Sequence, residues 1–144
     1  MTAGFTIFEA VMVILIVFVV VASLIPRVST TLAHSKVNRS AYVIAADLLY
    51  AQSIAARQHS PVAVQVLSDS LCFRITNVVN GAVLRTDWFD KSSAFQLTAL
   101  SASPTAAQVM PNGTSTSTMV VTVGGADYYH LVRITQAGQV RITK

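Results

Sequence analysis

The sequence predicts an α+β protein in which a long N-terminal helix is followed by a head of antiparallel strands. Three patterns support this fold class. An apolar run, AVMVILIVFVVVASLI, extends from Ala10 to Ile25. Apolar residues then recur at the spacings of three and four that mark one face of a helix. After Ser60-Pro61 the pattern changes to alternation with period two, which is typical of strands. The 144 residues suit one modest domain plus one apolar segment.

The first predicted element is a helix over residues 5–26 that is apolar on all sides. Glu9 is the only charged residue between Met1 and Pro26. A helix from Phe5 to Ile25 would rise roughly 30 Å, which matches the hydrocarbon thickness of a bilayer. We therefore expect a transmembrane helix here.

The helix is predicted to continue over residues 27–59 as an amphipathic second half. Pro26 removes one helical hydrogen bond, but no glycine follows it for many residues, so we expect a kink at Pro26 rather than an end. The predicted core stripe consists of Val37, Ala41, Ile44, Leu48, Ala51 and Ala55. The residues expected largely off this stripe are Lys36, Arg39, Asp47, Tyr50 and Arg57. Ser60-Pro61 should end the helix, because proline disfavours helical geometry in the residue before it.

Residues 60–144 are predicted to form a β-rich head packed on the second half of the helix. Alternation and the Asn80-Gly81 turn signal predict a hairpin meander over residues 62–66, 71–75 and 82–89. Further strands are predicted over residues 95–100, 119–123, 128–135 and 139–143. Ser, Thr, Pro and Gly dominate residues 101–118, so we expect a long loop there.

The composition offers little for catalysis or metal binding. The histidines are scattered, at His34, His59 and His130. Cys72, the single cysteine, alternates with apolar neighbours and is expected to be a small buried hydrophobic residue. Asp87, Asp90 and Asp127 are too few and too scattered to predict a calcium site. We expect no enzymatic activity, no metal and no cofactor.

Glu9 distinguishes three interpretations of the N-terminus: a cleaved secretory signal, an ordinary membrane anchor and a segment that assembles with others. A secretory signal has a basic start and a shorter apolar run. An ordinary anchor has no use for a carboxylate near the bilayer, where a charge is costly. Cleavage between Gly4 and Phe5 would create an α-amino group that can pair with Glu9 of the same or a neighbouring chain. In an apolar bundle, that pairing would favour one register between helices.

The run Gly4-Phe5-Thr6-Ile7-Phe8-Glu9, with the apolar stretch and Pro26 after it, resembles the class III signal of type IV pilins and type II secretion pseudopilins. The resemblance implies the pilin fold, with residues 1–4 as a leader remnant and residues 5–26 as the core helix of a filament. It also implies cleavage after Gly4 by a prepilin peptidase, N-methylation of Phe5 and a role for Glu9 in assembly.

The predicted helix, the short strands and the C-terminal hairpin with Gly138 at its turn resemble the GspH/FimT group of minor pilins. This resemblance implies a subunit that is held in the bacterial inner membrane with its head in the periplasm. It would then assemble with other pilin or pseudopilin subunits into a pilus or pseudopilus.

DNA binding during natural transformation is the alternative function. DNA-binding members of the group carry Gly-Arg-x-Arg near the C-terminus, whereas this chain has Gly138-Gln139-Val140-Arg141. Beyond Glu9 the sequence carries ten basic residues and five aspartates, a balance that permits an anionic partner. The candidate DNA contacts are Arg133, Arg141 and Lys144, which could equally be solvated charges that keep an edge hairpin soluble. A membrane-tethered domain that never assembles is a third possibility.

Overall fold

The computed structural model describes residues 7–125 and 128–144, without the side chains of residues 23–29. Its contacts divide the chain into two compact units, Met1–Ala33 and His34–Lys144. One helix, α1, spans Ile7–Gln58, which confirms the predicted helix over the described residues. The helix continues through Pro26, as expected, while the predicted kink at that residue stays a prediction.

The helix ends where the Ser60-Pro61 signal predicts. His59 adopts the left-handed conformation, with φ of 50°. The backbone N–H of Ser60 donates to the carbonyl oxygen of Ala55 at 3.3 Å, so it satisfies a carbonyl that the helix leaves unpaired. Pro61 then directs the chain into the first strand.

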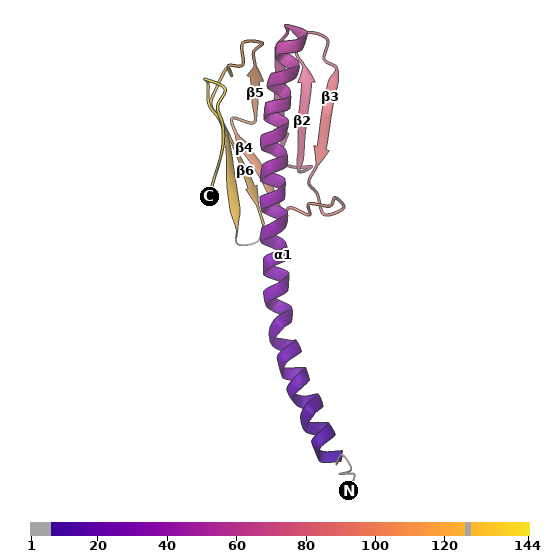
Figure 1. Ribbon diagram of the computed structural model, residues 1–144. Coiled ribbons are helices and arrows are strands. Elements are labelled where there is room, and N and C mark those ends of the chain that lie inside the picture. The colour runs from indigo at the N-terminus through magenta and orange to yellow at the C-terminus, as the bar shows by residue number, and fades with distance from the viewer. Residues whose placement is uncertain (1–6, 126–127) are drawn as a thin grey trace. The chain divides into compact units, whose positions relative to one another are not determined.

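The described part of the head contains eight strands in two antiparallel sheets (Figure 1). The strands are β1 (Val62–Leu67), β2 (Cys72–Asn77), β3 (Val83–Trp88), β4 (Ala99–Ser103), β5 (Ala106–Val109), β6 (Met119–Gly124), β7 (Tyr129–Ile134) and β8 (Val140–Thr143). One sheet has the order β3-β2-β1-β5 and the other the order β4-β6-β7-β8. Residues 34–58 of α1 run along the strands and pack against both sheets, as Figure 1 shows.

The predicted meander is confirmed by strands β1, β2 and β3, which pair antiparallel in sequence order. Asn77 organises the turn between β2 and β3. Its Oδ1 accepts from the backbone N–H of Val79 at 2.8 Å, and its own N–H donates to the carbonyl oxygen of Ala82 at 2.8 Å. Gly81 has φ of 69° in this turn, which explains the glycine at that position.

Two predictions in the second half of the head are wrong. Residues 101–118 are not one long loop, because β4 extends to Ser103 and β5 lies entirely within that range. Strand β5 pairs with β1, and its Ala107 and Val109 are buried. This strand is not evident from the sequence, because its side chains are small and its partner strand, β1, lies far away in the sequence. The strand expected over residues 95–100 begins only at Ala99, because Leu97 instead donates its N–H to the carbonyl oxygen of Phe89.

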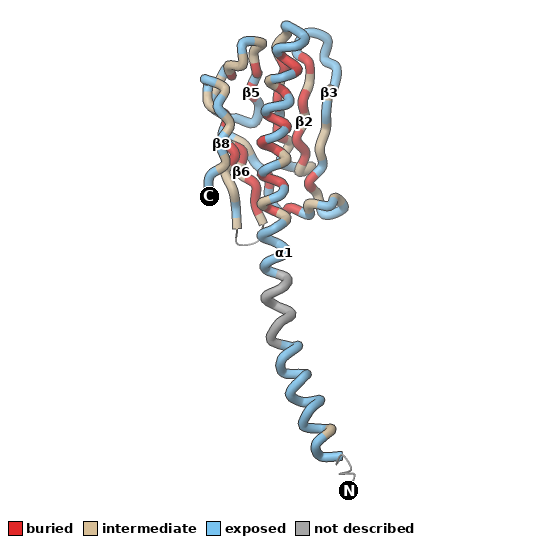
Figure 2. The backbone as a smooth tube through the Cα atoms, in the orientation of Figure 1, coloured by how far each residue is buried: buried red, intermediate tan, exposed pale blue. Residues whose placement is uncertain are grey.

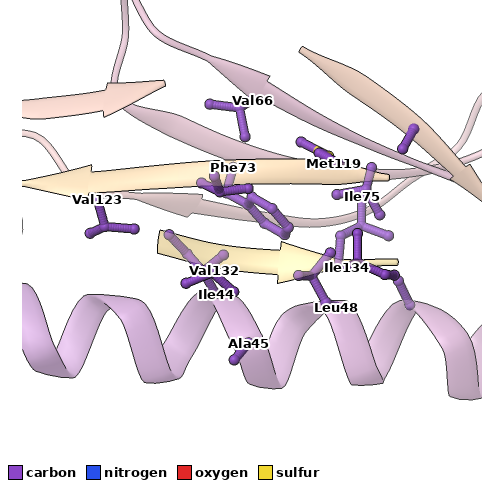
Figure 3. Close-up of a cluster of buried hydrophobic side chains, with 14 of the residues drawn as sticks. Ile44, Ala45, Leu48, Val66, Phe73, Ile75, Met119, Val123, Val132 and Ile134 are labelled. Atoms are coloured by element: carbon purple, nitrogen blue, oxygen red, sulfur yellow. The ribbon is translucent and has the colours of Figure 1, made fainter. Parts of the chain in front are cut away.

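The hydrophobic core lies between α1 and the inner faces of both sheets (Figure 3). The helix contributes the predicted stripe, of which Ile44 and Leu48 are fully buried. The sheets contribute Phe73 and Ile75 from β2, and Met119 from β6, among others. In Figure 2 the buried residues gather along this contact. The many alanines of the stripe let the strands approach the helix closely.

The structure corrects the prediction for Asp47. The sequence pattern placed this residue largely off the core stripe, but its exposed fraction is 1%. It lies one turn after Ile44 and beside Leu48, so it faces the sheets. Arg85 of β3 comes within 3.0 Å of Asp47, which is why an acid is tolerated there.

Candidate functional site: an apolar helix and a pair of arginines

The first candidate site is the apolar segment, residues 7–22 of α1. Every residue in it except Ala10 is exposed, and the exposed fraction reaches 86% for Ile7 and 72% for Phe18. In Figure 2 this stretch of α1 is almost uniformly exposed. Exposed apolar surface that is continuous over several turns is typical of residues that contact a membrane or other proteins. The described residues contain no helix long and apolar enough to cross a membrane.

Glu9 lies in the first turn of α1, within the apolar segment, and its side chain is exposed. A carboxylate near the N-terminus of a helix is favoured by the unpaired N–H groups at that end. Gly4 and Phe5, where cleavage and methylation are expected, lie outside the described residues. The pairing of Glu9 with an α-amino group therefore stays a prediction.

The second candidate site is the arginine pair, Arg133 and Arg141, on the outer face of the second sheet. The two residues are directly opposite each other on β7 and β8, and both side chains are exposed. Like charges at opposed positions destabilise a sheet. Strands β4, β6, β7 and β8 contain no Asp or Glu, so no carboxylate within the sheet offsets this repulsion. Both guanidinium groups are therefore accessible to solvent and carry charge that no acid of these four strands offsets.

Residues of β6, β7 and β8 surround the arginine pair on the same face. Val120 and Arg133 are cross-strand partners, as are Leu131 and Thr143. Tyr129 lies further along β7 on this face and has an exposed fraction of 57%. Arginine and an exposed aromatic ring on one flat face are the side chains that contact phosphates and bases of nucleic acids.

The structure does not place Lys144 with the arginine pair. Its Nζ lies 5.4 Å from the ring centroid of Tyr128, which stacks on His34 at a centroid distance of 4.3 Å. The hydroxyl of Tyr128 donates to Asn38 Oδ1 at 3.2 Å, and His130 Nε2 contacts the same oxygen. Lys144 thus lies beside a contact between the C-terminal strands and α1, and its role as a DNA contact stays a prediction.

Of the other polar residues considered from the sequence, Asp127 lies outside the described residues. The thiol of Cys72 is buried, as expected, and burial raises its pKa. Among the described residues, no three His, Cys, Asp or Glu side chains gather closely enough to hold a metal ion. A hollow of about 260 Å³ beside the end of α1 is lined by Tyr50, Ile54, Arg57 and Gln58. These four residues supply no nucleophile with an adjacent base.

Solved structures with the same fold are crystal structures of the type IV minor pilin FimU from Pseudomonas aeruginosa. In one crystal form the TM-score is 0.62 at 19% sequence identity, covering 76% of this chain and 90% of FimU. In another crystal form the TM-score is 0.59 at 22% sequence identity, and the match covers 74% of this chain and 92% of FimU. No family model and no curated protein matches the sequence. The chain therefore has the pilin fold of a minor pilin, as the sequence resemblance implied.

Proposed function

We propose that this chain is a minor subunit of a type IV pilus or of the related type II secretion pseudopilus, and that it assembles through its N-terminal helix. The observation that carries the proposal is the exposed apolar segment on a chain with the fold of a minor pilin. Burying one exposed Val, Leu, Ile or Phe side chain contributes about 1.5 to 3 kcal/mol. The many such residues on this helix therefore favour burial of the helix, in a membrane or in a bundle of like helices, over exposure to water.

Before assembly, the apolar segment would be held in the bacterial inner membrane, with the head in the periplasm. A prepilin peptidase would cleave between Gly4 and Phe5 and methylate the new N-terminus. The α-amino group of Phe5 would then neutralise Glu9 of the same or a neighbouring subunit. Because an unpaired carboxylate is costly inside an apolar bundle, this pairing would also fix the axial register of the helices.

The processing step is tested by the mass of the protein isolated from membranes of a host with an active prepilin peptidase. We expect an N-terminal peptide that begins with N-methylated Phe5. A chain that keeps residues 1–4, or one cut near Ala22 or Ala33, would instead indicate an uncleaved tethered domain or an ordinary secretory signal.

The assembly step is tested by replacing Glu9 with alanine and with aspartate. Immunoblots of sheared filaments should show less of the Glu9→Ala subunit, while its amount in membranes is unchanged. Glu9→Asp keeps the charge and should retain more incorporation. Equal incorporation of wild type and Glu9→Ala would remove the role assigned to this carboxylate.

DNA binding is the second candidate function, and the observation that favours it is the arginine pair. Binding through phosphates weakens as the salt concentration rises. Each phosphate contact that is lost reduces the slope of log affinity against log salt concentration by about one. We expect the full chain in detergent to bind a short duplex at low salt. Arg133→Ala and Arg141→Ala should each weaken binding, whereas Arg57→Ala, at the end of α1, should not. If all three changes weaken DNA binding equally, the affinity depends on the net charge of the chain and not on the arginine pair.

A further inference from the structure

Three charged side chains lie between α1 and the edge strand β3. Asp47 projects from the helix, and Arg85 and Asp87 project from β3. Arg85 Nε is 3.0 Å from Asp47 Oδ1 and 2.7 Å from Asp87 Oδ2. The side chain of Asp47 is only 2% exposed, whereas that of Arg85 is 42% exposed. Two carboxyl groups therefore compete for one cation at the margin of the core.

The geometry leaves Asp47 undersatisfied as an anion. Arg85 Nε has a single hydrogen, and it is donated to Asp87 Oδ2. Asp47 Oδ1 is in ionic contact with Arg85, and Asp47 Oδ2 is buried with no hydrogen-bond partner. A buried carboxylate in this state is costly, and the usual resolution in proteins is that the group takes up a proton.

The surroundings of Asp47 favour the protonated form. Burial, followed by the hydrogen bond and the charge of Asp87, raises the pKa of Asp47 to about 8 against the opposing effect of Arg85. Burial also acts to raise the pKa of Asp87, but hydrogen bonds with Asp47 and Arg85, and the charge of Arg85, bring it below its usual value.

Other groups near Asp47, Arg85 and Asp87 do not change the conclusion that Asp47 is protonated. Tyr50 of α1 faces Arg85, whose guanidinium carbon lies 5.7 Å from the centroid of the ring. The cross-strand partners of Asp87 and Arg85 on β2 are Phe73 and Ile75, both apolar. The thiol of Cys72 belongs to the opposite face of β2, and burial raises its pKa.

We propose that Asp47 and Asp87 share one proton at neutral pH, and that this proton latches the edge strand β3 onto α1. The protonated carboxyl of Asp47 donates to Asp87, while Arg85 neutralises the one remaining negative charge. Hydroxide removes the proton as water and leaves two carboxylates against one guanidinium. The repulsion then favours separation of β3 from the helix. This latch is a property of the head and does not depend on assembly.

The position of β3 makes it the element that would open. It is the edge strand of its sheet and pairs only with β2, so its release breaks a single ladder. The pairing is already irregular between Ile75 and Thr76. Trp88, the only tryptophan, lies at the end of β3 and is 50% exposed. Opening therefore has an intrinsic fluorescent reporter.

The latch is tested by hydrogen exchange of the β3 amides in the full chain in detergent, corrected for the exchange of an unstructured peptide at each pH. The fraction of molecules in which β3 has separated from α1 should rise about tenfold per pH unit from pH 5 to about pH 8 and then become constant. The reason is that the two aspartates take up one proton when β3 closes onto the helix. Fluorescence of Trp88 should change over the same range.

Two variants separate the latch from general effects of charge. The amide of Asp47→Asn is neutral and donates a hydrogen bond at every pH, so this variant should abolish the pH dependence of β3 opening. Asp69→Asn, in the exposed turn between β1 and β2, should keep that pH dependence. An unchanged pH slope in Asp47→Asn overturns the proposal. If Asp47→Asn does not fold, the pH titration of the carboxyl carbon resonances of the wild type decides. A carboxyl resonance whose titration midpoint lies near pH 8 supports the latch. Titration of every aspartate below pH 5 overturns it.

Discussion

Gln52 on α1 donates a hydrogen bond of 2.6 Å from its Nε2 to the carbonyl oxygen of Gly138, at the turn between β7 and β8. The same Nε2 lies 3.4 Å from the carbonyl oxygen of Gly113, in the turn after β5. One helical side chain thus joins two turns, one from the margin of each sheet. This contact fixes the hairpin that carries the arginine pair against α1.

Replacing Gly138 with alanine should destabilise the head. Gly138 has φ of 80°, and an added Cβ would lie 2.0 Å from the carbonyl oxygen of Gly113. The left-handed conformation and the clash together should cost about 2 to 4 kcal/mol in the free energy of unfolding, as measured in urea. Gly81→Ala is the matched control, because Gly81 has φ of 69° but nothing within 4 Å of the added Cβ. Equal losses for the two variants would contradict the close approach at Gly138.

Removing one charge of the arginine pair should stabilise the head. Arg141→Thr relieves the repulsion with Arg133 and should raise the free energy of unfolding by about 0.3 to 0.5 kcal/mol at low salt. The gain should shrink at high salt, where the two charges are screened. Lys91→Thr makes the same change of net charge at an exposed loop position and should give no comparable gain. A loss of stability in Arg141→Thr would indicate that Arg141 has a structural role.

The stability of the head should fall as the pH rises from 5 to 8. The pKa of Asp47 is about 8 in the folded chain and 3.8 as its ordinary value, so its contribution is fully present below pH 3.8 and is lost as the pH rises through 8. The decrease is at most about 1.4 kcal/mol per pH unit. Asp87, with its lowered pKa, acts in the opposite direction, and only in more acidic solution. Urea denaturation at each pH, with Asp47→Asn for comparison, measures the difference. Parallel pH profiles for the two proteins would contradict this assignment.

Features set by local sequence were predictable. Ser60-Pro61 gave the end of α1, and alternation with the turn before Gly81 gave the meander of β1 to β3. The position of Arg133 and Arg141 on one outward face also followed from alternation, although their direct opposition depends on the register of β7 and β8.

Features set by distant partners could not be predicted. Strand β5 has small side chains, and its identity as a strand depends on pairing with β1. The burial of Asp47 depends on Arg85, which reaches the helix from β3. One signal was present in the sequence, because Asp47 lies three residues after Ile44 and four before Ala51, both on the predicted stripe.

Photo-cross-linking from Phe18 in assembled filaments tests the central claim most directly. Phe18 is 72% exposed in the apolar segment, and a photoreactive phenylalanine analogue replaces it conservatively. If the helix packs in a filament core, the analogue at Phe18 should cross-link to the apolar helices of other subunits in sheared filaments. The same analogue at Tyr129, on the outer face of the head, should not reach those helices. Cross-links from Phe18 only to lipid, with the chain absent from the filaments, would contradict assembly through this helix.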